Sequence, residues 1–229
     1  MNENIGGLIK TITFRGVNCY LIKTKDGYIL VDTGYSNQRI KIENALDNVG
    51  VQPGNLKLIL LTHGDFDHSG NCAYFREKYQ SKIAMHKDDL GMVEHGDLFY
   101  SRESRNPFIR ILVKTVLPIL RMNLKKDDHF SPDIYLKEGD DLSEFGFSAR
   151  VIHLPGHSKG SIGFHTTEDD LFIGDLLENN EKQGPVKCSL IDNSGDFDAS
   201  IDKLKTLSLK TVYPGHGNPF PMEEFLKNY

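Results

Sequence analysis

The segment His63-Gly64-Asp65-Phe66-Asp67-His68 holds four side chains that can bind a metal ion within six residues. Imidazole and carboxylate groups are common ligands of zinc and of harder divalent ions. The segment directly follows the apolar run from Leu58 to Leu61, which reads as a buried strand. A loop at the end of a strand delivers such side chains to one point in space. The segment therefore predicts a metal site, against the alternative of a polar turn that begins a helix at Asp67 or Ser69.

Four further β-like runs are each followed by a candidate ligand with a glycine close by. Glycine permits the unusual dihedral angles and the close backbone approach that converging loops require. In layered α/β folds, such loops gather at one edge of the sheets. We therefore expect these loops to form one site with the segment from His63 to His68. The further candidates are Asp32, His157, Asp175 and His216.

Alternating strands and helices are predicted to position these residues. Strands are expected at 8–14, 19–22, 28–31, 56–61, 82–85, 134–136, 147–154, 162–165, 171–173 and 210–213. Helices are expected at 36–49, 69–79 and 199–207. This alternation is typical of a layered α/β domain, and 229 residues can bury one substantial core. We therefore expect a single domain over residues 1–229.

Residues 88–130 interrupt this alternation and form a predicted helical insertion. Between Arg102 and Lys126 there are seven Lys or Arg residues against one acid, Glu103. The apolar residues between 108 and 120 have helical spacing, and Pro118 is expected to kink or split that helix. Three interpretations stay open: a lid over the metal site, an interface of a homodimer, or an amphipathic surface helix that meets anionic lipid.

The bulk composition excludes some classes of protein. The net charge of −5 and the pI near 6.0 disfavour a whole-surface nucleic-acid binder, so the expected partner is a small-molecule substrate. No run approaches the roughly 18 apolar residues of a membrane span. No secretory signal is visible at the N-terminus. Three scattered cysteines favour reduced thiols, and we expect a cytoplasmic protein.

The chain resembles the metallo-β-lactamase superfamily over nearly its whole length. The resemblance rests on motifs that stand in the family's order: Val31-Asp32-Thr33-Gly34, the segment from Leu61 to Gly70, Leu154-Pro155-Gly156-His157-Ser158, Gly174-Asp175 and Pro214-Gly215-His216-Gly217. One short motif would be weak support, but five in order are strong. The resemblance implies a four-layer αββα sandwich, here with an insertion around residues 88–130, and a metal-dependent hydrolase.

By motif position, the resemblance also implies two divalent metal ions. The implied ligands are His63, Asp65 and His157 for the first ion, Asp67, His68 and His216 for the second, and Asp175 as a bridge between both. A hydroxide between the ions would be the nucleophile. Asp67 would orient that hydroxide and pass a proton to the leaving group. Asp32 would fix the metal loops by hydrogen bonds from behind the ligands.

Asp65 is the departure from the family's usual motif, His-x-His-x-Asp-His, in which a second histidine stands at this position. Asp65, Asp67, Asp175 and one hydroxide would together neutralise two divalent ions. The harder ligand set shifts the metal preference from zinc, the metal expected first, towards iron or manganese. The similar flavodiiron proteins carry a glutamate here and bind two irons.

The expected function is hydrolysis of a small ester, lactone or thioester at this site. Two alternatives from other classes stay open. Asp65 supports a non-haem di-iron oxidoreductase that acts on oxygen, nitric oxide or a sulfur compound. The other alternative is a metal-free binding protein built on the same fold. The metal content of the purified protein distinguishes the three.

Overall fold

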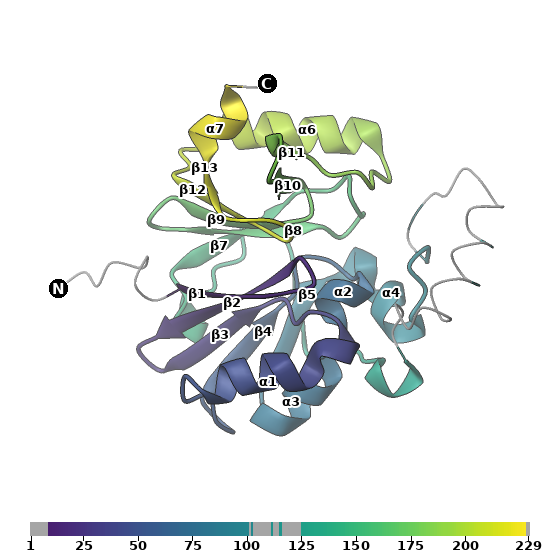
Figure 1. The fold of residues 1–229 in the computed structure, drawn as a ribbon, viewed down its shortest axis with the longest axis vertical. Helices are drawn as coiled ribbons and strands as arrows, with labels where there is room; N and C mark the ends of the chain where they lie inside the picture. The colour runs from purple at the N-terminus through teal and green to yellow at the C-terminus, as the bar shows by residue number, and fades with distance from the viewer. Residues whose placement is uncertain (1–8, 101, 103–110, 112–114, 116–124, 228–229) are drawn as a thin grey trace.

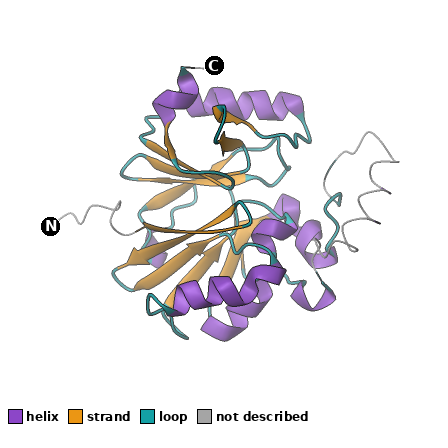
Figure 2. Ribbon diagram, viewed as in Figure 1, coloured by secondary structure: helices purple, strands orange, loops and turns teal. Residues whose placement is uncertain are grey.

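The structure is a computed structural model, and it describes residues 9–100, 102, 111, 115 and 125–227. Two sheets pack face to face, and helices cover the outer side of each, so the chain forms four layers (Figure 1). Figure 2 shows the strands at the centre of the molecule and the longer helices outside them. The predicted αββα sandwich is confirmed.

The first sheet has six strands in the order β1-β2-β3-β4-β5-β6. The first three pair antiparallel, whereas the pairs from β3 to β6 are parallel. The strands are β1 (Ile9–Phe14), β2 (Val17–Thr24), β3 (Gly27–Val31), β4 (Leu56–Leu60), β5 (Lys82–His86) and β6 (Ile134–Leu136). The helices of this half are α1 (Arg39–Asp47), α2 (Phe66–Ser69), α3 (Cys72–Tyr79) and α4 (Leu90–His95).

The second sheet has five strands in the order β13-β12-β9-β8-β7, and a separate hairpin pairs β10 with β11. Within this sheet β12 and β9 are parallel neighbours. The strands are β7 (Ala149–His153), β8 (Ile162–Thr166), β9 (Asp170–Gly174), β10 (Leu177–Asn180), β11 (Gly184–Lys187), β12 (Thr211–Pro214) and β13 (Phe220–Pro221). Helices α6 (Ser194–Lys205) and α7 (Met222–Leu226) lie on its outer side (Figure 1).

Strand β4 illustrates why the chain forms these layers. Successive side chains of a strand point to opposite faces of a sheet. Leu58 and Leu60 pack in the cluster between the two sheets, while Ile59 and the following Leu61 pack in the cluster shared with α1 and α3. A parallel strand that is buried on both faces needs an apolar run, and the residues from Leu58 to Leu61 provide one. A third cluster packs the second sheet against α6 and α7.

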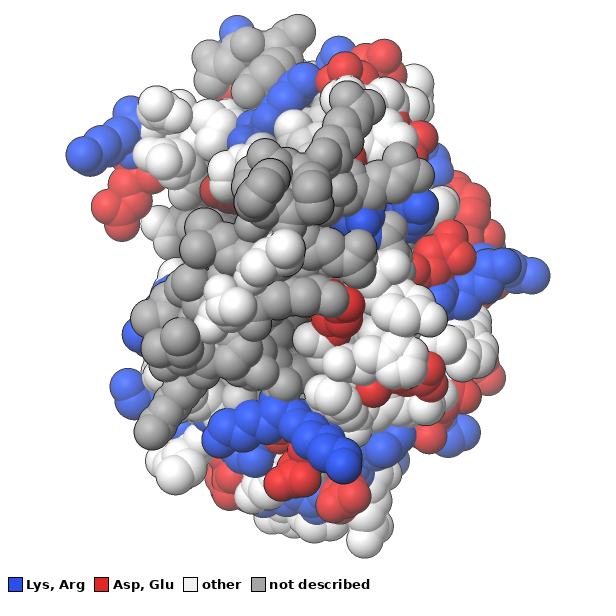
Figure 3. Space-filling model, turned by 90° about the vertical axis from the view of Figure 1, so that its right-hand side faces the viewer, with Lys and Arg blue, Asp and Glu red and all other residues white. Residues whose placement is uncertain are grey.

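The insertion predicted at residues 88–130 lies largely outside the described residues. Its described parts are the start up to Tyr100, single positions that include Arg102, and the end from Lys125. The helix predicted around 108–120 lies outside the described residues, so the lid, dimer and lipid interpretations stay predictions. On the face of the molecule drawn in Figure 3, side chains of both charge signs lie near one another. No helix among the described ranges is long and apolar enough to cross a membrane.

Candidate metal centre

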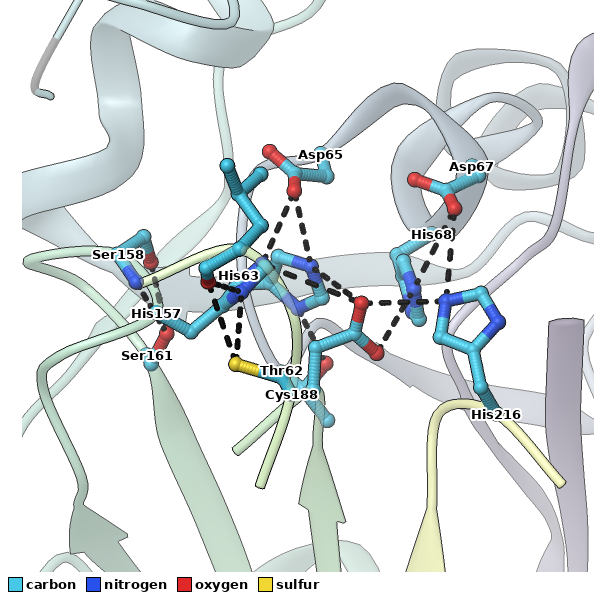
Figure 4. Close-up of polar contacts among 12 residues, drawn as sticks. Thr62, His63, Asp65, Asp67, His68, His157, Ser158, Ser161, Cys188 and His216 are labelled. Carbon is cyan, nitrogen blue, oxygen red and sulfur yellow. Dashed lines mark hydrogen bonds and ion pairs between the residues drawn. The ribbon is translucent and has the colours of Figure 1, made fainter. Parts of the chain in front are cut away.

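The structure brings the seven predicted ligands together. The segment after β4 supplies four of them, and the second sheet supplies His157 after β7, Asp175 after β9 and His216 after β12. Their ligand atoms form overlapping groups whose members lie within 4.8 Å of one another: His63, Asp65 and His157; His63, His68 and Asp175; Asp67, His68 and His216. Figure 4 shows these side chains converging from the two halves of the molecule.

Parallel strand pairing explains the convergence. The carboxyl ends of parallel neighbours meet at one edge of a sheet. Asp32 follows β3 and the segment from His63 follows β4, and these two strands are parallel. Asp175 and His216 follow β9 and β12, which are also parallel. Asp32 therefore lies beside the segment from His63, and Asp175 lies beside His216. His157 follows β7, which β8 separates from β9 in the same sheet.

Gly215 allows the last ligand loop to approach the others. Its backbone amide donates to the carbonyl of Gly174 at 2.7 Å. A Cβ at position 215 would lie 2.0 Å from Oδ1 of Asp175 and 2.7 Å from Cε1 of His68. Only glycine leaves room for these two predicted ligands, so this residue is required by the packing of the centre itself.

Backbone carbonyls fix the rings of two of the four histidines. Nδ1 of His157 lies 2.8 Å from the carbonyl oxygen of Leu190, and Nδ1 of His216 lies 3.0 Å from that of Gly16. A carbonyl oxygen only accepts, so each Nδ1 carries the hydrogen and donates it. In a neutral ring the lone pair is then on Nε2, the atom that faces the centre.

Asp32 fixes the rings of the other two histidines in the same orientation, with Nε2 towards the centre. Its carboxylate accepts from Nδ1 of His68 at 2.9 Å and from the hydroxyl of Thr62 at 2.8 Å. Because that hydroxyl donates to Asp32, its oxygen is left to accept from Nδ1 of His63, at 2.9 Å. Both rings therefore present an Nε2 lone pair to the centre. This arrangement agrees with the supporting role predicted for Asp32.

Three buried atoms in the centre have no hydrogen-bond partner within the described part of the chain: Nε2 of His63, Nε2 of His68 and Oδ1 of Asp175. Buried polar atoms are normally paired, so an unpaired group calls for an explanation. The three residues belong to one group whose ligand atoms lie within 4.8 Å of one another. Nε2 of His68 lies 3.2 Å from Oδ1 of Asp175 without forming a well-aligned hydrogen bond. Two imidazole nitrogens and a carboxylate oxygen that share a buried space fit a divalent metal ion.

The acidic side chains of the centre have different proton affinities. Burial raises the pKa of Asp175, but His68 and His216 hold it well below its ordinary value. Burial raises the pKa of Asp67, and the opposing charge of His68 does not cancel that effect. Asp175 is therefore suited to remain an anion, whereas Asp67 is the carboxylate suited to hold and release a proton.

Arg102 is a member of the centre that sequence reasoning missed. Its guanidinium donates to both carboxylate oxygens of Asp65, at 2.7 and 2.8 Å. Burial would raise the pKa of Asp65, but Arg102, together with His157 and His63, holds it well below its ordinary value. In the sequence Arg102 stands at one end of a cationic stretch, and nothing local marks it as the partner of a residue 37 positions away.

Asp89 is a second residue that the sequence did not single out. It is fully buried, and its carboxylate accepts from the backbone amide of Gly64 at 2.9 Å and from that of Gly160 at 2.8 Å. The hydroxyl of Ser158 also donates to it, at 2.6 Å. These bonds tie the loop after β4 to the loop after β7, so Asp89 fixes the two halves of the centre relative to each other.

Known proteins resemble this chain over most of its length. A family model described as the metallo-beta-lactamase superfamily matches residues 12–216. The acyl-coenzyme A thioesterase MBLAC2 of Bos taurus is 26% identical over 226 residues, which cover 92% of this chain and 76% of that protein. Hydroxyacylglutathione hydrolase GloC of Haemophilus influenzae is 29% identical over 212 residues, which cover 88% of this chain and 85% of that protein.

A solved structure agrees in both sequence and fold. The di-iron-bound form of TTHA1623 is 28% identical to this chain and superposes with a TM-score of 0.69. The match covers 94% of each chain. The likeness therefore extends over nearly the whole of both chains.

Proposed function

This chain belongs to the metallo-β-lactamase superfamily and is a metallo-hydrolase, and from that premise we propose that it hydrolyses a small thioester at a divalent metal ion. One observation carries the proposal. All four histidines of the centre have their Nδ1 atoms bonded to oxygen, so each ring turns its Nε2 atom towards the carboxylates of the centre. A metal-free binding protein would have no need of this uniform orientation.

The chain's own residues would position the reaction. When bound, a divalent ion supplies a Lewis acid and lowers the pKa of a water ligand to about 7. His63, His68 and Asp175 would hold the ion, with His216 beside them. Asp67 would accept the proton of the attacking water and return it to the leaving group, and its raised pKa suits both steps. Its Oδ2 lies 3.6 Å from Nε2 of His216, at the margin of the ligand group.

A thioester is favoured within the predicted range of esters, lactones and thioesters. The names of two relatives, an acyl-coenzyme A thioesterase and a hydroxyacylglutathione hydrolase, both describe the cleavage of an acyl group from a thiol carrier. The chain also offers an apolar surface beside Asp67. The rings of Tyr35 and Phe66 pack at 5.8 Å between centroids, and burial, with Asp67 nearby, raises the pKa of Tyr35 to about 12. This neutral aromatic pair could contact an acyl chain.

The test compares matched substrates on protein of known metal content. Chelated protein is reloaded with zinc, iron(II) or manganese and given a short-chain acyl thioester of coenzyme A, S-lactoylglutathione, the corresponding oxygen ester, a γ-lactone and a phosphodiester. We expect release of free thiol that disappears on chelation and returns on reloading. Asp175→Asn should lower the rate at least about 100-fold, because it removes an anionic ligand. The control Asp141→Asn makes the same chemical change at an exposed residue paired with Arg150.

Two outcomes would count against the thioesterase proposal. Thiol release that is insensitive to chelation would remove the metal from the reaction. Iron-loaded protein that consumes oxygen or nitric oxide and cleaves none of these substrates would favour the oxidoreductase alternative. Support for that alternative rested on Asp65 as a hard ligand, and it is weaker now that both oxygens of Asp65 bond to Arg102.

A further inference from the structure

The guanidinium of Arg102 lies among the atoms that a first metal ion is predicted to bind. Nη1 donates to Oδ1 of Asp65 at 2.7 Å, and Nη2 donates to Oδ2 at 2.8 Å. Nη2 also lies 3.0 Å from Nε2 of His157. That Nε2 and Oδ2 of Asp65 are themselves 3.0 Å apart, and both have lone pairs when the ring is neutral. The guanidinium thus serves as the cation between two predicted ligands of the first ion.

Arg102 is held firmly in this position. Arg102 is only 6% exposed. Its remaining N–H groups donate to backbone carbonyls: Nε to that of His157 and Nη1 to that of Leu98, both at 3.3 Å. Each of the five donors of the guanidinium therefore has an acceptor. Moving Arg102 away would break these bonds and leave Asp65 as a buried, unpaired anion, which is strongly unfavourable.

The atoms without partners lie elsewhere in the centre. Nε2 of His63, Nε2 of His68 and Oδ1 of Asp175 are the buried ligand atoms that make no hydrogen bond within the described ranges, and their residues form one group. One ion placed among them would pair all three. The predicted first group shares His63 with this set, but its other two members, Asp65 and His157, already have Arg102. The hydrogen bonding of the centre therefore calls for one ion.

The charge of the guanidinium also disfavours a second ion. Its Nη2 lies 2.8 Å from Oδ2 of Asp65 and 3.0 Å from Nε2 of His157. An ion bound to those two atoms would lie against the guanidinium, and two cations in contact at a buried site repel each other strongly.

We propose that Arg102 takes the place of the first metal ion, so that this chain binds one divalent ion, among His63, His68 and Asp175. This inference rests on the proposed function only in that a metal ion binds at the centre. It makes Arg102 a positioning residue with a defined charge: the guanidinium supplies one positive charge at the site where relatives with a second histidine would use an ion.

Metal stoichiometry tests the inference without any activity assay. Wild-type protein is dialysed against zinc and then against metal-free buffer, and zinc per chain is measured by elemental analysis. A parallel titration of the chelated protein with cobalt(II) follows the absorption bands of the bound ion. We expect one zinc per chain and a cobalt plateau at one equivalent. Arg102→Ala should raise both values to two, because it frees Asp65 and His157.

Two further variants test whether the guanidinium of Arg102 sets the number of bound ions. Arg102→Ala combined with Asp65→His recreates the family's histidine motif without the competing cation, and we expect two ions. Arg76→Ala is the matched control, since Arg76 also bonds to a carbonyl and lies 3.8 Å from an aspartate oxygen, far from the ligands. It should stay at one ion. If Arg102→Ala does not fold, the wild-type plateau and the double variant still test the proposal.

The results separate this inference from the proposed function. Two tightly bound ions in the wild-type protein, or one ion in both the wild type and Arg102→Ala, would overturn the role given to Arg102 and leave the thioesterase proposal standing. One ion in a protein that cleaves no substrate would do the reverse. A chain that binds no ion would overturn both.

Discussion

At the scale of single residues, the relay from Asp32 through Thr62 to His63 decides which ring nitrogen faces the ion. The hydroxyl of Thr62 donates to Asp32 and accepts from His63, so one hydrogen bond sets the direction of the next. A metal-ligating histidine commonly depends on such a partner for its tautomer and orientation. The relay therefore contributes to metal affinity although neither Asp32 nor Thr62 is a predicted ligand.

Thr62→Val tests this relay, because valine keeps the shape of threonine and removes the hydroxyl. We expect zinc affinity to fall about 10- to 100-fold, since His63 loses the acceptor for its Nδ1 hydrogen. Competition with a chromophoric chelator measures the affinity directly. Thr206→Val serves as the control, because its hydroxyl donates to a helix carbonyl on the exposed surface. Unchanged affinity in Thr62→Val would mean that His63 needs no relay.

The sequence predicted which residues converge at the centre, and it did not predict their hydrogen-bond partners. His63 and His216 could be found because each follows a β-like run and stands beside glycine or another ligand, a local pattern. Arg102 could not be found in this way, because its pairing with Asp65 joins residues 37 positions apart. Composition placed Arg102 in a cationic stretch and suggested a surface role. Only the fold shows that this one arginine is buried.

At the scale of elements, helices α1 and α3 are joined by a polar contact at the edge of an apolar interface. Asp47 on α1 accepts from the hydroxyl of Tyr79 at 2.7 Å and from the ammonium of Lys78 at 3.1 Å, both on α3. Burial raises the pKa of Asp47, but these two hydrogen bonds and the charge of Lys78 together outweigh burial and lower the pKa below its ordinary value. The contact therefore makes the packing of the two helices depend on pH.

The sign of this dependence follows from the lowered pKa of Asp47. Its contribution to stability is fully present above the ordinary aspartate pKa of about 4 and is lost as pH falls through the lower folded value. Asp47→Asn should cost less than about 1 kcal/mol in the free energy of unfolding at pH 7, because the group is largely exposed. The difference from wild type should shrink near pH 3.

Urea unfolding of the chelated protein at the two pH values measures this difference without interference from metal release. Asp26→Asn is the control, because Asp26 lies in the β2–β3 turn and has only a distant, exposed contact with Lys25. A difference between Asp47→Asn and wild type that is equal at pH 7 and pH 3 would contradict the assignment.

The elements that the sequence predicted are those with strong apolar periodicity. Strand β4 was expected at 56–61 and is Leu56–Leu60, and the helix expected at 199–207 is α6, Ser194–Lys205. Its earlier start was missed because the first turn, Ser-Gly-Asp, resembles a loop. The side chain of Asn193 caps it by accepting from the amides of Gly195 and Asp196. The β10–β11 hairpin was also missed, because Leu177–Asn180 is mostly polar.

At the scale of the whole molecule, the metal centre joins the two halves of the sandwich. One half supplies the segment from His63 to His68, and the other supplies His157, Asp175 and His216. An ion bound by ligands from both halves stabilises the folded state and not the unfolded chain. With free ion at 100 times Kd, that stabilisation is about 2.7 kcal/mol.

Chelation should therefore lower the melting temperature of the wild-type protein, and excess zinc should restore it. Differential scanning calorimetry with and without chelator measures the shift. In Asp175→Asn, which lacks the ligand between the two halves, the chelator should have little effect. An equal shift in both proteins would place the stabilising ion outside this centre.

The attachment of the His216 loop has a kinetic consequence. Strand β2 holds that loop from the other end of the chain: the side chain of Asn18 donates to the carbonyl of Gly217 across 199 positions, and His216 donates to Gly16 across 200. Contacts at such separation form slowly, because the entropy of closing a long loop must be overcome before they stabilise anything. We therefore expect a newly made chain to complete the set of candidate ligands late in folding, and to bind its ion only after the sandwich has formed.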